Sequence, residues 1–304
     1  EQGFVALAGG DVVMPPILSM AIQDHNGEID VKTAYVPGLD SFAIKMSPGF
    51  FDNPALGLPS TAGLMVLFSA RTGVLEALLL DNGYLTDVRT AAAGAVAARH
   101  LAREDANSAC IIGTGNQARL QLKALKLVRQ ISQATIWGRD TAKATAAAEA
   151  LTRELGIPVA ASDDAAAAVS AADIIVTTTP SAEPLVMADW LWPGQHITAM
   201  GSDQEHKCEL DPACIGRADL YVPDRQSQTE LLGELRGAIQ VGIVKPGHNF
   251  AELGDIISGK AQGRPDDDAI TIADLTGTGV QDTAIATFAK RQSEKHHLGT
   301  EFEN

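Results

Sequence analysis

The sequence predicts an α/β fold with a doubly wound parallel sheet, preceded by a smaller region rich in β-strands. From about Ser108 onward, short apolar segments alternate with longer helical ones, which is the pattern of βαβ units. A glycine loop, "GTG", joins the first of these strands to its helix. Residues 1 to about 90 instead show strand-like segments separated by Gly, Asp and Asn turns.

The first region is expected to form a meander of β-strands. Its strand segments are "IDVKTAYVPG", "SFAIKMSPGF" and "TAGLMVLFSARTGVLEALLLDNG", with a hairpin signal at "SARTG". The segment "TDVRTAAAGAVAARHLA" predicts a long helix that carries the chain into the next region. The opening "EQGFVALAGG" lacks a Met and resembles the end of a helix, so we expect further residues before it.

The alternating region accounts for most of the chain. Its expected strands are "SACIIG", "QATIWGRD", "IPVAAS", "IIVTTT", "HITAMG", "DLYVPD" and "AITIADLTGTG". The Ala-rich "TAKATAAAEALTRELG" predicts a helix that ends at its glycine. The tail from about Asp282 predicts a last helix that returns to the first region. We therefore expect one domain of residues 1–90 plus 283–304 and a second of residues 91–282.

Composition excludes several classes of partner. A net charge of −15 repels phosphate backbones and anionic lipid, so neither nucleic acid nor a membrane is expected to bind. No apolar run approaches the ~18 residues that span a bilayer, and no signal-peptide pattern is visible. Three sparse cysteines predict buried thiols in a reducing compartment rather than a disulfide framework or a zinc site. We expect a cytoplasmic protein without a metal.

The glycine loop predicts a Rossmann-type dinucleotide site. Gly113 would allow the tight turn, Gly115 the close approach of a phosphate, and Ala118 close packing of helix against strand. The pyrophosphate would then lie at the helix N-terminus, where free amides and the dipole favour an anion. The alternative is an ordinary strand-to-helix turn.

The end of the second strand in this region bears on the choice of cofactor. An acid there would bind the 2′-hydroxyl of NAD, whereas an Arg without the acid suits the 2′-phosphate of NADP. The strand ends with Gly138 and Arg139, and Asp140 comes late enough to cap the next helix instead. The sequence therefore favours NADP, with NAD possible; the alternative is that Arg139 is an ordinary surface residue.

Candidate chemical groups fall in two places. In an open α/β sheet, ligands bind beyond the carboxyl ends of the strands, which selects "TTTP" and "MGSDQEHK" with Asp203 and Lys207. Asp203 would face the nicotinamide end or act as a loop cap, and Lys207 would touch the cofactor or be solvated. In the first region, Lys32, Lys45 and Arg89 stand on elements that look buried and could gather an α-carboxylate. Arg89 is expected at the head of its helix, where the dipole disfavours a cation.

Taken together, "DVRTAAA", "IIGTGNQA" and "MGSDQEHKCEL" resemble the ornithine cyclodeaminase/μ-crystallin family along essentially the whole chain. The segment "DVKTAYVPGLDSFAIKMSPGFFDN" is most similar to members associated with ectoine catabolism. The resemblance implies a two-domain homodimer, in which the first region and the C-terminal helix bind substrate and dimerise. It also implies NAD(P) chemistry at the Cα of an amino acid or its imine.

The resemblance assigns roles by position. Lys45 matches a substrate-binding and catalytic Lys, Arg89 the Arg that binds the substrate carboxylate near the cofactor, and Asp203 the catalytic Asp that handles water or a proton. Asn116, Gln117, Thr179 and Lys207 match cofactor contacts, and Gly138 matches the position that reads the ribose. We expect them to bind the cofactor together with Arg89, Thr90, Gly113, Gly115 and Arg139. Many members carry a carboxylate-binding Arg after an "MP" run, but this chain has "MPPILSM", so we expect Lys32 to take over that role. The alternative is that Lys32 reaches solvent at the dimer surface.

The sequence and the resemblance together predict a nicotinamide-dependent imino-acid reductase or amino-acid dehydrogenase, and the resemblance implies a role in ectoine or related amino-acid catabolism. Redox-neutral cyclodeamination is the alternative, and a non-catalytic small-molecule binding protein of μ-crystallin type is the alternative from another class. The joint presence of Lys45, Arg89 and Asp203 favours an enzyme.

Overall fold

A computed structural model describes residues 1–301 of the chain. It divides into two compact units. The first unit consists of Glu1 and Thr90–Gly277, and the second of Gln2–Arg89 and Thr278–Asn304. The sequence-based boundary between residues 282 and 283 lies inside the last helix, α10 (Gly279–His296), which belongs as a whole to the second unit.

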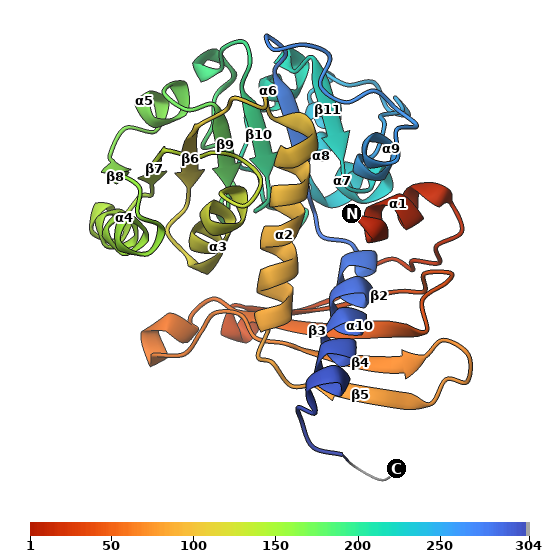
Figure 1. Ribbon diagram of the computed structural model, residues 1–304. Coiled ribbons are helices and arrows are strands. Elements are labelled where there is room, and N and C mark those ends of the chain that lie inside the picture. The colour runs from red at the N-terminus through yellow and green to blue at the C-terminus, as the bar shows by residue number, and fades with distance from the viewer. Residues whose placement is uncertain (302–304) are drawn as a thin grey trace. The chain divides into compact units, whose positions relative to one another are not determined.

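The first unit contains a seven-stranded sheet in which every pair of neighbours is parallel (Figure 1). The strand order is β11-β12-β10-β9-β6-β7-β8. The strands are β6 (Ser108–Ile112), β7 (Gln133–Trp137), β8 (Val159–Ser162), β9 (Ile174–Thr177), β10 (His196–Ala199), β11 (Leu220–Pro223) and β12 (Thr271–Asp274). The order reverses direction between β6 and β9, which is the switch point where ligands bind in doubly wound sheets. The α/β prediction is confirmed.

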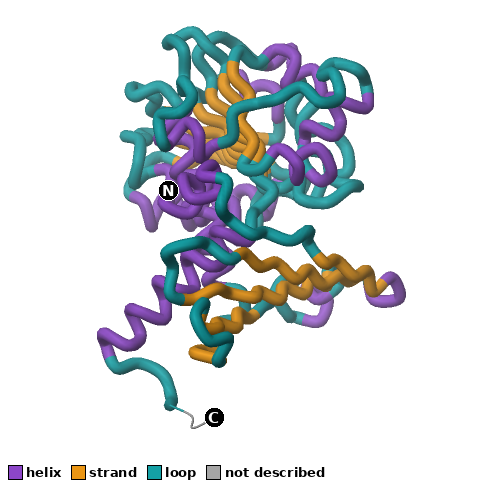
Figure 2. Tube along the Cα trace, turned by 90° about the vertical axis from the view of Figure 1, so that its right-hand side faces the viewer, coloured by secondary structure: helices purple, strands orange, loops and turns teal. Residues whose placement is uncertain are grey.

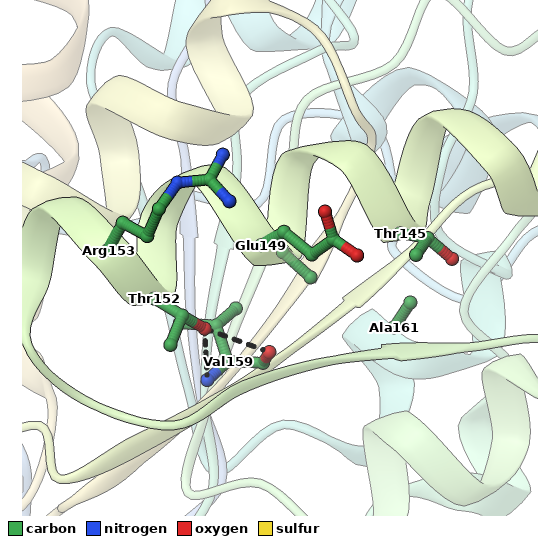
Figure 3. Close-up of a pocket in the computed structure, with 7 residues that line it drawn as sticks. Thr145, Glu149, Thr152, Arg153, Val159 and Ala161 are labelled. Atoms are coloured by element: carbon green, nitrogen blue, oxygen red, sulfur yellow. Dashed lines mark hydrogen bonds between the residues drawn. The ribbon is translucent and has the colours of Figure 1, made fainter.

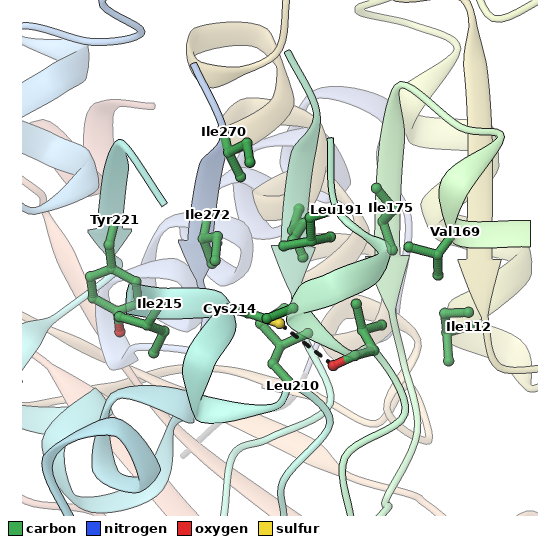
Figure 4. Packing of buried hydrophobic residues seen from close by; sticks show 14 of the residues in the cluster. Ile112, Val169, Ile175, Leu191, Leu210, Cys214, Ile215, Tyr221, Ile270 and Ile272 are labelled. Atoms are coloured by element: carbon green, nitrogen blue, oxygen red, sulfur yellow. Dashed lines mark hydrogen bonds between the residues drawn. The ribbon is translucent and has the colours of Figure 1, made fainter. Parts of the chain in front are cut away.

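Helices cover both faces of this sheet because its central strands are apolar on both sides. In β6, Cys110 and Ile112 enter one hydrophobic cluster, which Figure 4 shows, while Ala109 and Ile111 enter the other. The helices are α3 (Asn116–Leu125), α4 (Thr141–Leu155), α5 (Ala165–Ser170), α6 (Pro212–Arg217), α7 (Gln226–Leu232), α8 (Glu234–Gln240), α9 (Leu253–Ile257) and a 3₁₀ turn, η3 (Ala188–Trp190). The sequence did not predict α7, α8 and α9.

The second unit is an antiparallel meander, as predicted, and it has five strands in the order β1 to β5. Strands are coloured orange in Figure 2. The strands are β1 (Leu18–Ile22), β2 (Gly27–Ala34), β3 (Ser41–Phe50), β4 (Leu64–Ser69) and β5 (Leu75–Leu79), with 3₁₀ turns η1 (Gln23–His25) and η2 (Asn53–Leu56). The remaining helices are α1 (Gln2–Gly9) and α2 (Tyr84–Leu101), and α2 begins in the second unit and ends in the first.

One face of the meander packs under α10. There the Thr283 hydroxyl accepts a hydrogen bond from the Ala43 amide (3.1 Å) and donates one to the Ala34 carbonyl (2.8 Å). The opposite face stays open and apolar, because Leu18, Met20 and Leu78 are 60%, 54% and 54% exposed. Within residues 1–301, no helix combines the length and apolar character needed to cross a bilayer.

Candidate active site

The glycine loop between β6 and α3 has the geometry of a phosphate cradle. Gly113 has a φ of +133°, and a Cβ there would overlap the Thr178 hydroxyl, so only glycine fits. A Cβ at Gly115 would meet nothing within 4 Å, which leaves open space in front of the α3 N-terminus. Ala118 is fully buried against the sheet. The residues present therefore fit a dinucleotide pyrophosphate at the switch point.

The end of β7 carries no acid that is available for a ribose. A Cβ at Gly138 would lie 2.5 Å from the Thr114 methyl group, so a larger residue there would require the Thr114 side chain to shift. Arg139 is exposed. Asp140 is the N-cap of α4, where its carboxylate accepts a hydrogen bond from the Lys143 amide at 3.1 Å, as the sequence suggested.

The loop after β10 carries an ion pair. The ammonium of Lys207 lies 2.6 Å from the Asp203 carboxylate. Lys207 is buried, which speaks against the alternative of a solvated lysine, and its contact with a cofactor stays a prediction. The Asp203 side chain keeps 37% exposure. Asp203 can therefore be reached by a ligand while Lys207 holds its negative charge in place.

A buried acid joins this loop to the neighbouring strand end. One carboxylate oxygen of Glu209 accepts hydrogen bonds from the Thr179 amide (2.5 Å) and hydroxyl (2.7 Å), and the other accepts from the Gly201 amide (2.8 Å). The Thr179 hydroxyl thus donates its hydrogen bond to Glu209, and the predicted contact of Thr179 with a cofactor stays a prediction. Burial raises the pKa of Glu209 to about 7, although these donors act in the opposite direction.

The second unit holds a cluster of buried charges beneath α10. Asp282, fully buried, lies 3.2 Å from the Lys45 ammonium and 3.0 Å from the Arg89 guanidinium. Arg89 also donates a hydrogen bond to the Gln281 side chain at 2.9 Å. Burial and then the charge of Arg89 lower the pKa of Lys45 to about 7. Burial alone would raise the pKa of Asp282, but Lys45 and Arg89 hold it below its usual value.

Lys32 joins this cluster from the next strand. It stands directly opposite Lys45 in the β2–β3 register, and it is only 5% exposed. Its charge contributes to the lowered pKa of Lys45. The alternative in which Lys32 reaches solvent is therefore wrong for this chain. Asp30, also buried, lies two residues earlier on the same face of β2.

Arg89 and Thr90 lie within α2. Arg89 is not at the head of its helix, because α2 begins five residues earlier at Tyr84, so the dipole argument does not apply to it. The carbonyl of Thr90 accepts a hydrogen bond from the Gln121 amide (3.1 Å), which also contacts Gln117 (3.4 Å). Thr90 and Gln117 thus meet at one side chain of α3.

The structure gathers the predicted residues into one set per unit. In the first unit the glycine loop, Thr179, Asp203 and Lys207 lie at carboxyl ends of strands. In the second unit Lys32, Lys45 and Arg89 meet. Sequence reasoning missed Asp282 and Glu209. The only signal for either was its place in the motifs "GTGVQD" and "KCEL", because an acid in a chain with 38 acidic residues is otherwise ordinary.

A surface pocket of about 350 Å³ lies elsewhere, between α4 and β8 (Figure 3). Its lining includes Thr145, Glu149 and Arg153, and the Thr152 hydroxyl bonds the Val159 backbone beside it. It contains none of the residues that the sequence singled out, and its chemistry suggests no reaction.

The chain has close relatives of known sequence. It is 60% identical over its whole length to a protein of Sinorhizobium fredii named an uncharacterized cyclodeaminase, of which it covers 92%. It is 62% identical, with the same coverage, to a putative dehydrogenase of Rhizobium meliloti.

Solved structures share the fold at full length. Δ¹-pyrroline-2-carboxylate reductase of Thermococcus litoralis, in complex with NADH and L-proline, has a TM-score of 0.94 at 30% identity and covers 99% of this chain (93% of its own). An archaeal alanine dehydrogenase dimer with bound NAD has a TM-score of 0.91 at 31% identity (99% and 92% covered). Iminosuccinate reductase of Paracoccus denitrificans with NAD⁺ reaches 0.90 at 29% identity (99% and 92%). The family model of the ornithine cyclodeaminase/mu-crystallin family matches residues 1–296, and the chain belongs to this family.

Proposed function

We propose that this protein is a nicotinamide-dependent enzyme that reduces 2-imino acids at Cα, or oxidises the corresponding amino acids in reverse. The charge balance of the second unit carries the proposal. Its buried charged side chains, among the described residues, are Lys32, Lys45, Arg89, Asp30 and Asp282. While Lys45 keeps its proton, three cations against two acids leave one positive charge, which a single substrate carboxylate would neutralise. The bound carboxylate would in turn favour the protonated form of Lys45.

The protein groups suit this chemistry. Bound nicotinamide would supply the hydride, and the protein would supply orientation and protons. Lys45, with a pKa of about 7, is able to hold or release a proton near neutral pH. Arg89 offers a planar guanidinium for a carboxylate. Asp203, reachable and held by Lys207, is the acid that we assign to proton transfer at the imine nitrogen.

The similar structures support the same class of reaction. The three structures described above are named as a pyrroline-carboxylate reductase, an iminosuccinate reductase and an alanine dehydrogenase, each with NADH or NAD. All three names describe chemistry at a carbon that bears both nitrogen and a carboxylate. An ectoine-related substrate stays a prediction of the sequence alone.

The decisive experiment is a substrate panel. Purified protein should be given NADPH or NADH with Δ¹-pyrroline-2-carboxylate, pyruvate plus ammonia, or oxaloacetate plus ammonia, and separately L-ornithine or L-lysine. We expect the reduced nicotinamide to be consumed with at least one imino acid, and mass spectrometry to find the matching amino acid. Ammonia release from a diamino acid without net change in nicotinamide absorbance would establish cyclodeamination instead.

Cyclodeamination is the second candidate, favoured by the name of the Sinorhizobium relative. It requires a substrate with a distal ammonium group. Lys32, Lys45 and Arg89 make the second unit an unfavourable place for a further cation. Binding of ligands without turnover of any of them would support the third candidate, a binding protein of mu-crystallin type.

We assign NADP(H) as the preferred cofactor because Gly138 and Arg139 replace the acid and Asp140 is engaged as a helix cap. Dissociation constants for NADPH and NADH should be compared in wild type and in Arg139→Ala. The variant should lose affinity for NADPH alone. Arg153→Ala, in the last turn of α4 and so at the opposite end of that helix from Arg139, is the control that should change neither. Tighter binding of NADH, unaffected by Arg139→Ala, would contradict the assignment.

We also propose a homodimer formed through the open face of the meander. The face presents Leu18, Met20 and Leu78, and such apolar patches are usually covered by a partner. The archaeal alanine dehydrogenase is described as a dimer. Sedimentation should find a dimer for wild type and monomers for Met20→Glu combined with Leu78→Glu.

A further inference from the structure

Glu209 is the most completely engaged buried acid near the Asp203 loop. It is 0% exposed, and its two carboxylate oxygens accept three hydrogen bonds, from Thr179 and from Gly201. Its backbone is tied as well. The amide donates to the Glu234 side chain (2.8 Å), and the carbonyl accepts from the amides of Leu185 (2.7 Å) and Val186 (3.1 Å).

These contacts connect three segments at the ligand-binding edge of the sheet. Thr179 follows β9, Gly201 follows β10, and the two strands are paired, with Ala199 opposite Thr177. Glu209 itself ends the loop that carries Asp203 and Lys207. The connection is tight, because a Cβ at Gly201 would overlap both the Thr179 carbonyl and the Glu209 carboxylate. The loop is therefore closed on itself, with Gly201 at its start bound to Glu209 at its end.

We propose that Glu209 is a positioning residue that, in its ionised form, holds the Asp203–Lys207 loop in its working geometry; this rests on the function proposed above. The groups that face its carboxylate oxygens are donors: the N–H groups of Thr179 and Gly201, the Thr179 hydroxyl, and the Thr177 hydroxyl, which also lowers the pKa of Glu209. A carboxylate is an acceptor only, so it suits a site that donors alone surround, and it accepts the three bonds from Thr179 and Gly201. A protonated glutamic acid or a glutamine at this position carries a donor of its own, which would face the Thr179 or the Gly201 donors. The hydrogen bond to that residue would then be lost.

The titration of Glu209 supports this geometry. Burial raises its pKa to about 7, and the nearby Glu234 has a pKa of about 8 because of burial and the charge of Asp274. The other titratable neighbours are Cys208, which contacts Glu234, and Tyr221, which donates to Asp274. No cation contributes to the pKa of Glu209 among its main causes. Lowering the pH through 7 should therefore release the loop.

Glu209→Gln tests the proposal, with wild-type and variant enzymes assayed on Δ¹-pyrroline-2-carboxylate, pyruvate plus ammonia and oxaloacetate plus ammonia. We expect kcat to fall by about 10²-fold, as for a misplaced catalytic group, with KM and dinucleotide affinity nearly unchanged. The decline of wild-type kcat below about pH 7 should be absent from the variant. Hydrogen exchange of the Thr179 and Gly201 amides should accelerate.

Two further variants separate positioning from plain stability. Asp224→Asn is the matched control, because Asp224 is an equally buried acid that accepts from the amides of Gly277 and Arg225 at the ends of β12 and β11. It should lower the melting temperature but keep the decline of kcat below pH 7. Gly201→Ala opens the same connection without changing charge, so it should lower kcat like Glu209→Gln.

The outcomes are distinguishable. The proposal would be overturned if Glu209→Gln changed neither kcat nor the hydrogen exchange of the Thr179 and Gly201 amides. It would also be overturned if Glu209→Gln and Asp224→Asn lost kcat equally and had the same pH profile of kcat. If wild type turns over none of the imino acids while amide exchange rises only in Glu209→Gln, the proposed function fails and the structural connection stands.

Discussion

The two units differ in their balance of buried acidic and basic side chains. Among the described residues, the buried Asp, Glu, Lys and Arg side chains of the first unit are five acids and one lysine: Asp173, Glu209, Asp224, Glu234, Asp274 and Lys207. Those of the second unit are three cations and two acids. Several acids of the first unit are satisfied by backbone amides at strand ends, as Glu209 and Asp224 show. A buried acid that amides already satisfy orders loops, whereas a surplus of buried cations creates a demand for an external anion.

The largest effect is expected at Asp203, which, unlike the buried acids of the first unit, keeps 37% of its side chain exposed and within reach of a ligand. Asp203→Asn removes the proton acceptor but keeps an oxygen for Lys207, so folding and dinucleotide affinity should persist. Turnover should fall by about 10²–10⁴-fold, the usual contribution of a positioned general acid or base. Steady-state kinetics and a melting curve on the same preparation check this, and near-wild-type turnover would refute the role.

Removing the central acid of the second unit should mainly affect stability. Asp282→Asn leaves Lys45 and Arg89 buried around an uncharged group, which typically costs about 3–5 kcal/mol when a buried pair is broken. Urea unfolding should show this loss, and added acetate should restore part of it by supplying the missing negative charge. Asp24→Asn, an exposed acid of the same unit, is the control. A loss that is no larger than the control's would remove the basis for the contrast between the units.

A smaller effect is expected at Lys32. It tests whether the surplus positive charge of the second unit binds the substrate carboxylate. Lys32→Met should raise KM for the imino acid about tenfold, in line with the loss of one charged hydrogen bond, with kcat little affected. Lys290→Met, at a partly exposed ion pair with Glu76, should leave KM unchanged. If KM is the same in Lys32→Met and wild type, Lys32 does not bind the carboxylate.

The smallest effect concerns the pH dependence of stability in the first unit. Glu234 keeps its proton up to about pH 8 in the folded state but releases it near 4.5 when unfolded, so its contribution is complete below 4.5 and is lost as pH rises to 8. Wild type should therefore lose at least about 1 kcal/mol relative to Glu234→Gln between pH 5 and pH 8, since one pKa unit corresponds to about 1.4 kcal/mol. Parallel urea midpoints for the two proteins across this range would contradict the assignment.

Much of the fold could be predicted because each βα unit has its own local signal. Apolar runs such as "SACIIG" identify buried strands, and glycine is required at Gly113 by its backbone conformation. The short helices α7, α8 and α9 were missed because five to seven residues give too little periodicity to detect.

The site could be predicted only in part, for a different reason. Lys32 and Lys45 stand out as cations in apolar strands, and their pairing follows from a short turn between the strands. Asp282 and Glu209 have no such contrast with their neighbours. Their importance arises from contacts that the chain makes over long separations, and local patterns do not report these.

The helix that covers the meander, α10, is synthesised late. Thr283 bonds Ala43 and Ala34 across separations of 240 and 249 residues, and Asp282 beside it is the partner of Lys45 and Arg89. The ribosome therefore completes the sequence of the whole first unit, through Gly277, before it makes the helix that covers the second unit's sheet. During that interval the nascent second unit carries its cations without their central acid and an uncovered apolar face, so it is the part of the nascent chain that is most exposed to chaperones and proteases.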